Sequence, residues 1–155
     1  MQLTTSHAQE ANCAHFTTYW LHSVFPMMQA LGEDAMRILY SAKQDPMVID
    51  TRSALTELSE RVRTMAASAN QFAEYPAAVS GRPAPYDELL KGMRIKITQG
   101  QSNVEISRDR WLNLELSCGD LDKLCDNLIV NEDGAHNHLY TTPISLIIEA
   151  DDNLF

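Results

Sequence analysis

The sequence contains none of the short signatures that identify common enzyme classes. It has no glycine-rich phosphate loop, no Gly-x-Ser-x-Gly nucleophile elbow and no His-Glu-x-x-His zinc helix. Its apolar stretches, such as Ile144–Ile148, are far shorter than the roughly 20 residues that span a bilayer. Residues Met1–His7 lack the basic and apolar segments of a secretory signal peptide. We therefore expect a cytoplasmic protein that has no membrane partner.

Cysteines are also few. The chain has three among 155 residues, an odd number without the spacing of a disulfide framework, which indicates a reduced intracellular protein. Hydrophobic residues make up 45% of the chain and charged residues 21%, close to globular averages. A chain of this size can bury a core of its own without a disulfide or a metal.

Basic residues are scarce and unevenly distributed. The formal net charge is -9, and residues 115–155 hold nine carboxylates against one base, Lys123, so this segment carries -8. A concentrated negative field repels nucleic acid and anionic membranes and attracts basic surfaces. Four basic residues do gather near one predicted hairpin, where we expect solvated strand positions, which cross-strand acids can pair with, rather than a nucleic-acid site. They are Arg94, Lys96, Arg108 and Arg110.

The first half of the chain predicts helices. Phe16, Trp20 and Val24 recur at four-residue spacing, and Pro26 then ends or kinks the pattern. The helical spacing resumes with Leu31, Ala35, Ile38 and Leu39. A further helix is predicted to begin at Asp50, a suitable N-cap, and to place one apolar stripe against a core. Its stripe consists of Leu55, Leu58, Val62, Met65, Ala69 and Phe72.

The second half of the chain predicts strands. Residues 75–92 are rich in Pro and Gly, with a possible short helix at Asp87–Lys91, and the periodicity then changes to alternation. Strands are predicted at 93–97, 104–106, 111–116, 135–141 and 144–150, the first two joined as a hairpin. A single helix is predicted to open at Gly119. Its apolar face consists of Leu121, Leu124, Cys125 and Leu128.

These elements predict an α+β fold in which N-terminal helices precede a roughly five-stranded, mainly antiparallel sheet with one helix. The chain divides into a helical region (1–75), a Pro-rich connection (76–92) and a sheet-plus-helix region (93–155). We expect all three to form one compact domain.

The pair His136-x-His138 is the motif closest to known site chemistry. Residues two apart on a strand point to the same face, so both imidazoles could bind one metal ion. Cys118 and Cys125 are seven residues apart on a predicted helix, about 10 Å, which is too far to share that ion. A third ligand at a characteristic spacing is missing. A small metal-dependent enzyme centred on the two histidines therefore stays open as an alternative, and we predict no metal, no cofactor and no catalytic residue.

The acidic residues concentrate around the C-terminal helix. Asp122 and Asp126 are four residues apart, where like charges destabilise a helix by a few tenths of a kcal/mol. A basic partner would relieve this repulsion, whereas the alternative is an ordinary solvated surface. The residues that we predict to form a partner-binding face are Asp120, Asp122, Asp126, Glu132, Asp133, His136 and His138.

The C-terminal third combines a strand, a Leu-rich helix opened by Gly119, a Gly-x-His-x-His segment at 134–138 and an apolar strand ending in Glu149. This combination resembles the small acidic immunity proteins of bacterial polymorphic toxin systems. The resemblance implies a protein that covers the active site of a cognate toxin or locks its conformation, without catalysis. A toxin that acts on nucleic acid has a basic active-site surface, which an acidic binder complements.

The sequence thus favours a non-enzymatic, acidic protein that binds and neutralises a toxic enzyme. The expected partner is a basic protein, namely a cognate toxin domain. Two alternatives are the metal-dependent enzyme and a phage-encoded acidic inhibitor of a nucleic-acid-binding complex. An adaptor whose helical half binds a partner is a third.

Overall fold

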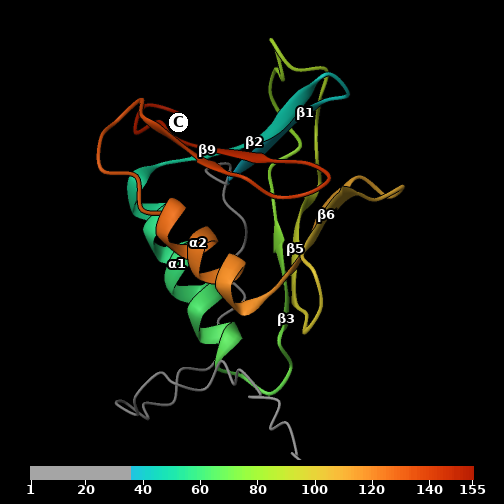
Figure 1. Ribbon diagram of the computed structural model, residues 1–155. Coiled ribbons are helices and arrows are strands. Elements are labelled where there is room, and N and C mark those ends of the chain that lie inside the picture. Colours follow the sequence, from blue (N-terminus) through green and yellow to red (C-terminus); the bar gives the residue numbers. More distant parts are fainter. Residues whose placement is uncertain (1–35) are drawn as a thin grey trace, which may run out of the picture.

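A computed structural model describes residues 36–155, and the structural statements that follow concern these residues. They form an α+β fold with two helices and nine strands, which are arranged in two mixed sheets (Figure 1). The stripe of Phe16, Trp20 and Val24 and the predicted break at Pro26 lie outside the described residues.

The five-stranded sheet has the strand order β4-β1-β2-β9-β8. The strands β2 and β9 are parallel, and the other neighbours are antiparallel. Because β2 and β9 are far apart in the sequence, their pairing joins the two ends of the described chain. The bounds are β1 Arg37–Ser41, β2 Gln44–Asp50, β4 Glu88–Leu89, β8 His136–Leu139 and β9 Leu146–Ala150.

The four-stranded sheet has the strand order β3-β5-β7-β6. Its central strands β5 and β7 are parallel, and each has an antiparallel partner on its outer side. The strand β3 is therefore an edge of this sheet within the described chain. The bounds are β3 Phe72–Pro76, β5 Gly92–Ile97, β6 Asn103–Ile106 and β7 Trp111–Leu116.

Each helix begins at a hydroxyl N-cap. In α1 (Arg52–Ala66) the side chain of Thr51 accepts a hydrogen bond from the backbone N–H of Ala54 at 3.2 Å. In α2 (Cys118–Asn127) Ser117 accepts in the same way from Asp120 at 3.3 Å. These bonds satisfy N–H groups that have no partner within the helix.

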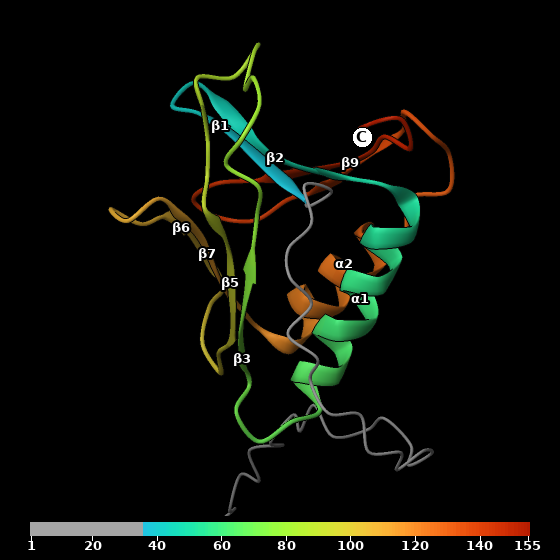
Figure 2. The ribbon, with the colours of Figure 1, turned by 180° about the vertical axis from the view of Figure 1, so that it is seen from behind.

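The helices share one core with both sheets. Figures 1 and 2 show α1 and α2 side by side, with the four-stranded sheet along them and the five-stranded sheet across one end. The buried apolar cluster draws residues from both helices and both sheets. Its fully buried members include Leu55 of α1, Leu124 of α2, Ile95 of β5 and Ile148 of β9.

A buried hydroxyl fastens α1 to α2. Ser59, which is 1% exposed, donates a hydrogen bond from Oγ to the carbonyl oxygen of Cys125 at 2.8 Å. The N–H of Ile129, the usual helical donor to that carbonyl, instead bonds to Asp126. The last carbonyls of a helix lack intrahelical donors, so Ser59 supplies the partner that α2 requires at this buried end.

The prediction of N-terminal helices followed by one five-stranded sheet is wrong. Residues 37–50, whose first part was expected to be helical, form the antiparallel strands β1 and β2. Ile38 and Leu39 satisfied a helical spacing, yet Ile38 is buried and pairs with Val48 in the sheet. A few apolar residues fit either period, and the β-branched run Val48–Ile49 favours a strand once a partner strand is available.

The predicted helix at 50–72 is confirmed for its first four turns and wrong at its end. The helix begins at Arg52, and its C-cap is Ala67. The backbone then reverses through Gln71, which has a positive φ of 49°, and Phe72 begins β3. Phe72 therefore fits the helical spacing by coincidence. Asn70, a residue type that is common in turns, and Gln71 lie in the turn between α1 and β3.

Two smaller predictions also fail. Residues 87–91 are not a short helix, because Glu88–Leu89 forms β4 and pairs with β1. The strands at 93–97 and 104–106 exist but are not a hairpin, since β7 lies between them. Alternation assigns the two faces of a strand and leaves its neighbours undefined. The predicted α2, β7, β8 and β9 are confirmed, with small shifts of their bounds.

Candidate binding surface

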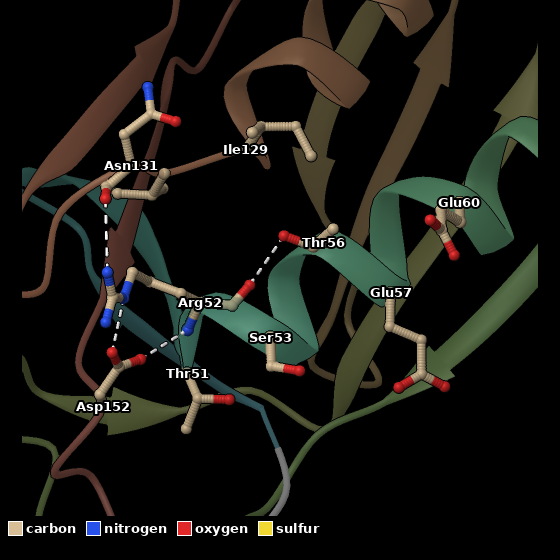
Figure 3. A pocket seen from close by; sticks show the side chains of 10 residues that line it. Thr51, Arg52, Ser53, Thr56, Glu57, Glu60, Ile129, Asn131 and Asp152 are labelled. Atoms are coloured by element: carbon tan, nitrogen blue, oxygen red, sulfur yellow. Dashed lines mark hydrogen bonds and ion pairs between the residues drawn. The ribbon is translucent and has the colours of Figure 1, made fainter.

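The C-terminal tail is fastened to the N-terminus of α1 by Asp152. Its carboxylate accepts one hydrogen bond from the backbone N–H of Arg52 at 2.9 Å and one from Arg52 Nε at 2.5 Å (Figure 3). The backbone bond and then the guanidinium lower the pKa of Asp152. A carboxylate at this place also complements the helix dipole. Arg52 is therefore neutralised within the molecule.

A shallow hollow lies beside this ion pair, between α1 and the segment that follows α2. Figure 3 shows Glu57 and Glu60 on α1 beyond the Arg52–Asp152 pair, with no interaction drawn to either. Ile129 lines the other side and is 38% exposed, whereas most of the large aliphatic side chains described in residues 36–155 are buried. The hollow thus combines free carboxylates with accessible apolar surface.

A second hollow lies on the other side of Glu57 and Glu60, between α1 and β3. Its apolar lining includes Met65 and Phe72, and Phe72 is 46% exposed. Arg61 stands four residues after Glu57, a spacing suited to a helical ion pair. Its guanidinium instead lies over the ring of Tyr75, 5.1 Å from the centroid, so Glu57 keeps no counter-ion in the described chain.

Three of the predicted acidic residues have partners inside the protein. Asp120 accepts from Ser102 Oγ at 2.5 Å and from Lys123 Nζ at 2.9 Å, and these contacts lower its pKa. Asp126 forms an ion pair with Arg63 of α1 at 3.0 Å. Asp133 accepts from the backbone N–H of Asp152 at 2.7 Å. These carboxylates therefore have structural roles: Asp120 links the start of α2 to the loop before β6, Asp126 pairs the two helices, and Asp133 holds the C-terminal segment.

Two others, Asp122 and Glu132, are exposed and form no ion pair within residues 36–155. The Arg63–Asp126 pair joins the exposed sides of α1 and α2, so Asp122 lies on the same side of the molecule as Glu57 and Glu60. We call this surface the acidic helical face and define it by its free carboxylates. They are Glu57, Glu60 and Asp122.

His136 and His138 lie elsewhere. Both are exposed on β8, and between them Asn137 turns inward and donates to the carbonyl of Asn127 at the end of α2. Alternation places the two imidazoles on the opposite side of the sheet from α2. Their ring centroids are 5.1 Å apart, and the ring of Tyr140 stacks on His138 at 5.9 Å. The structure therefore does not bring the seven predicted residues onto one face.

Over residues 36–155 no group of three His, Cys, Asp or Glu side chains is placed to hold a metal ion. Cys125 is a free cysteine at 1% exposure, packed in the core.

Three of the four basic residues at or near the four-stranded sheet form ion pairs, and no ion pair of Arg108 is found within residues 36–155. Arg94 contacts Glu74 at 2.8 Å and Asp109 at 3.0 Å, and Lys96 contacts Glu115 at 3.4 Å. Arg110 pairs with Glu88. The positive charges of this surface are thus largely matched by acids, unlike the negative charges of the acidic helical face.

Sequence reasoning overlooked Glu57, Glu60, Phe72 and Ile129. The two glutamates fall off the apolar stripe of α1, which marks them as solvent-facing. The sequence does not show which groups Arg61 and Arg63, the nearest bases, contact. Because these contact Tyr75 and Asp126, they leave the glutamates unmatched, and only the tertiary structure shows this.

Asp50, at the carboxyl end of β2, is a buried acid with no cation partner within the described chain. The residue is 8% exposed, and its carboxylate accepts a hydrogen bond only from the N–H of Thr51 at 2.8 Å. Burial raises the pKa of Asp50 above its ordinary value of 3.8, and the hydrogen bond opposes this shift in part. Ionised Asp50 therefore destabilises the folded state.

We expect Asp50→Asn to raise the melting temperature at pH 7. A folded-state pKa above the unfolded value means that wild-type stability falls as the pH rises through that range. Below pH 3.8 most of the unfolded state also carries the protonated acid, so the gap between variant and wild type should become small there. Thermal unfolding at pH 7 and at pH 3.5 measures it, and an equal gap at both pH values would contradict the assignment.

None of the helices between residues 36 and 155 has the length and apolar character needed to cross a membrane. Comparison of the chain with protein-family models, with curated proteins and with solved structures found no match.

Proposed function

We propose that the chain is a non-enzymatic, acidic binding protein that neutralises a toxic enzyme, acting in the bacterial cytoplasm as an immunity protein. The observation that carries this proposal is the excess of free carboxylates on the acidic helical face, beside accessible apolar side chains. Three of the nearby bases, Arg52, Arg63 and Lys123, each pair with an aspartate, and the fourth, Arg61, lies over the ring of Tyr75.

A basic surface is the partner that this arrangement supports. Free carboxylates at a protein surface attract cationic groups and accelerate their encounter. Ile129 and Phe72, which flank Glu57 and Glu60, supply apolar area of the kind that anchors an interface. An enzyme that acts on nucleic acid presents such a basic surface around its active site, and an acidic protein that covers it excludes the substrate.

The test is protection of a cell from the toxin. The C-terminal domain of the protein encoded next to this chain is expressed in a susceptible bacterium, with and without the chain. We expect growth to be restored only when the chain is present, together with a one-to-one complex of the purified proteins. A chain that neither binds this domain nor restores growth would exclude the proposed function for that pair.

A further inference from the structure

We propose that the hollow between α1 and β3 accepts an extended segment of a protein partner, which adds a strand to the edge of β3 that has no neighbour within residues 36–155 and carries Lys or Arg toward Glu57 and Glu60. This proposal rests on the proposed function only for the basic character of the partner. It specifies the form in which a partner segment binds.

The first support is the direction of the β3 backbone. Outside β3, the N–H of Ile97 donates to Gln71 and the N–H of Ala77 donates to Lys91, at 3.0 and 2.9 Å. Because antiparallel pairs alternate, Ala73 and Tyr75 also bond toward β5, whereas Phe72 and Glu74 direct their N–H and C=O groups away from it. The edge of β3 thus offers two donors and two acceptors.

The second support is that α1 and β3 together line a hollow along this edge. The lining includes Thr64 and Met65 from the helix and Phe72, Ala73 and Tyr75 from the strand. A groove between a helix and an edge strand is suited to strand addition, in which backbone hydrogen bonds give affinity and alternate side chains give specificity. Such an edge is otherwise blunted by Lys, by a bulge or by a covering element. Residues 72–75 contain no Lys, and Pro76 limits the open edge to a short segment.

The third support is charge. Side chains of an added strand would alternate between α1 and the outer face of the four-stranded sheet. Those that face α1 would meet Glu57 and Glu60, which form no ion pair in the described part of the chain, and also Arg61, whose guanidinium lies over the Tyr75 ring. Two carboxylates against one guanidinium leave this part of the lining net negative. Those that face outward would meet the exposed ring of Phe72. The groove therefore favours a segment in which basic and aliphatic residues alternate.

The experiment uses the full chain, labelled with ¹⁵N, and three blocked hexapeptides as probes. The first alternates lysine and valine, the second replaces lysine with glutamate, and the third is the lysine peptide N-methylated at alternate amides. For the lysine peptide we expect amide shifts centred on Phe72 and Glu74. The N-methylated peptide keeps charge and side chains but loses backbone donors, so it should bind about tenfold more weakly. The glutamate peptide should not bind.

Two variants of one residue separate backbone pairing from charge. Glu74→Pro removes an edge N–H that makes no bond to β5, and Glu74→Ala removes the same carboxylate but keeps the N–H. We expect the proline variant to bind the lysine peptide about tenfold more weakly than the alanine variant. Thermal melts of both would verify folding. If the proline variant does not fold, the N-methylated peptide on the wild-type chain decides the same question.

Equal binding of the methylated and unmethylated peptides, or shifts confined to α2 and residues 129–133, would overturn strand addition. No binding of the lysine peptide would overturn it as well. If the chain protects against the toxin but fails these binding tests, the proposed function stands and strand addition to β3 is excluded. If the chain binds the lysine peptide as described but protects against no toxin, strand addition stands and only the proposed function as an immunity protein is excluded.

Discussion

Replacing Gly92 with alanine is expected to lower the free energy of unfolding by about 2 kcal/mol, within the range for overpacking a well-packed site. A Cβ at this position would lie 2.4 Å from Trp111 Cζ3 and 2.6 Å from the carbonyl oxygen of Tyr75. The backbone of β3 cannot yield without breaking its pairing with β5. An outward tilt of the indole would disturb its contact with the Arg94 guanidinium, which lies 4.4 Å from the ring centroid.

Gly119 provides the matched control. It lies in the first turn of α2 with no atom within 4 Å of a Cβ built there. Alanine has the higher helix propensity, so Gly119→Ala should stabilise the protein by about 0.5–1 kcal/mol. Urea unfolding of both variants gives the two values. A loss at Gly92 no larger than 0.5 kcal/mol, about the effect of an ordinary surface change, would show that the Trp111 ring is not confined as described.

The local elements with strong periodicity could be predicted from the sequence. The apolar stripe of α1 from Leu55 to Met65 and that of α2 from Leu121 to Leu128 both proved to be buried faces. The alternation of residues 93–97 and 111–116 likewise marked true strands. These patterns depend only on which side of an element meets the core, and a single sequence records that directly.

The neighbours of the strands could not be predicted. Parallel pairing of β2 with β9 joins residues 47–50 to residues 147–150, and nothing local in either segment specifies the other. The same applies to the insertion of β7 between β5 and β6. Long-range pairing is decided by the packing of the whole core, so a residue such as Ile38 can satisfy a helical spacing and still form a strand.

The candidate binding surface, too, could be predicted only in part from the sequence. The excess of acid around α2 was visible in the sequence, and Asp122 and Glu132 do lie exposed without counter-ions in the part of the chain described. Asp120, Asp126 and Asp133 were expected beside them, yet each has a structural partner. Whether a charge is available depends on the positions of the bases, which come from distant segments. The composition therefore predicts that the surface is negatively charged, whereas only the tertiary structure shows which carboxylates have no partner.

The variant Glu57→Gln/Glu60→Gln/Asp122→Asn is expected to slow association with the toxin domain by about tenfold at low ionic strength. Electrostatic steering changes association rates by about 10–10³-fold and is screened by salt, so the difference should shrink in 0.5 M salt. All three side chains are exposed and make no ion pair within residues 36–155, so the exchange to amides leaves the fold intact. Stopped-flow mixing at two salt concentrations measures both effects.

A control variant with the same net charge separates local from overall electrostatics. Asp45→Asn/Asp87→Asn/Glu105→Gln removes three exposed carboxylates outside the acidic helical face, and both variants move the net charge from -9 to -6. If the acidic helical face receives the partner, the first variant slows association more than the control, and the contrast is greatest near 0.1 M salt, where the field of a charge weakens steeply beyond about 10 Å. Equal slowing would mean that only the overall charge matters. Slowing by the control alone would place the interface near Asp45, Asp87 or Glu105 instead.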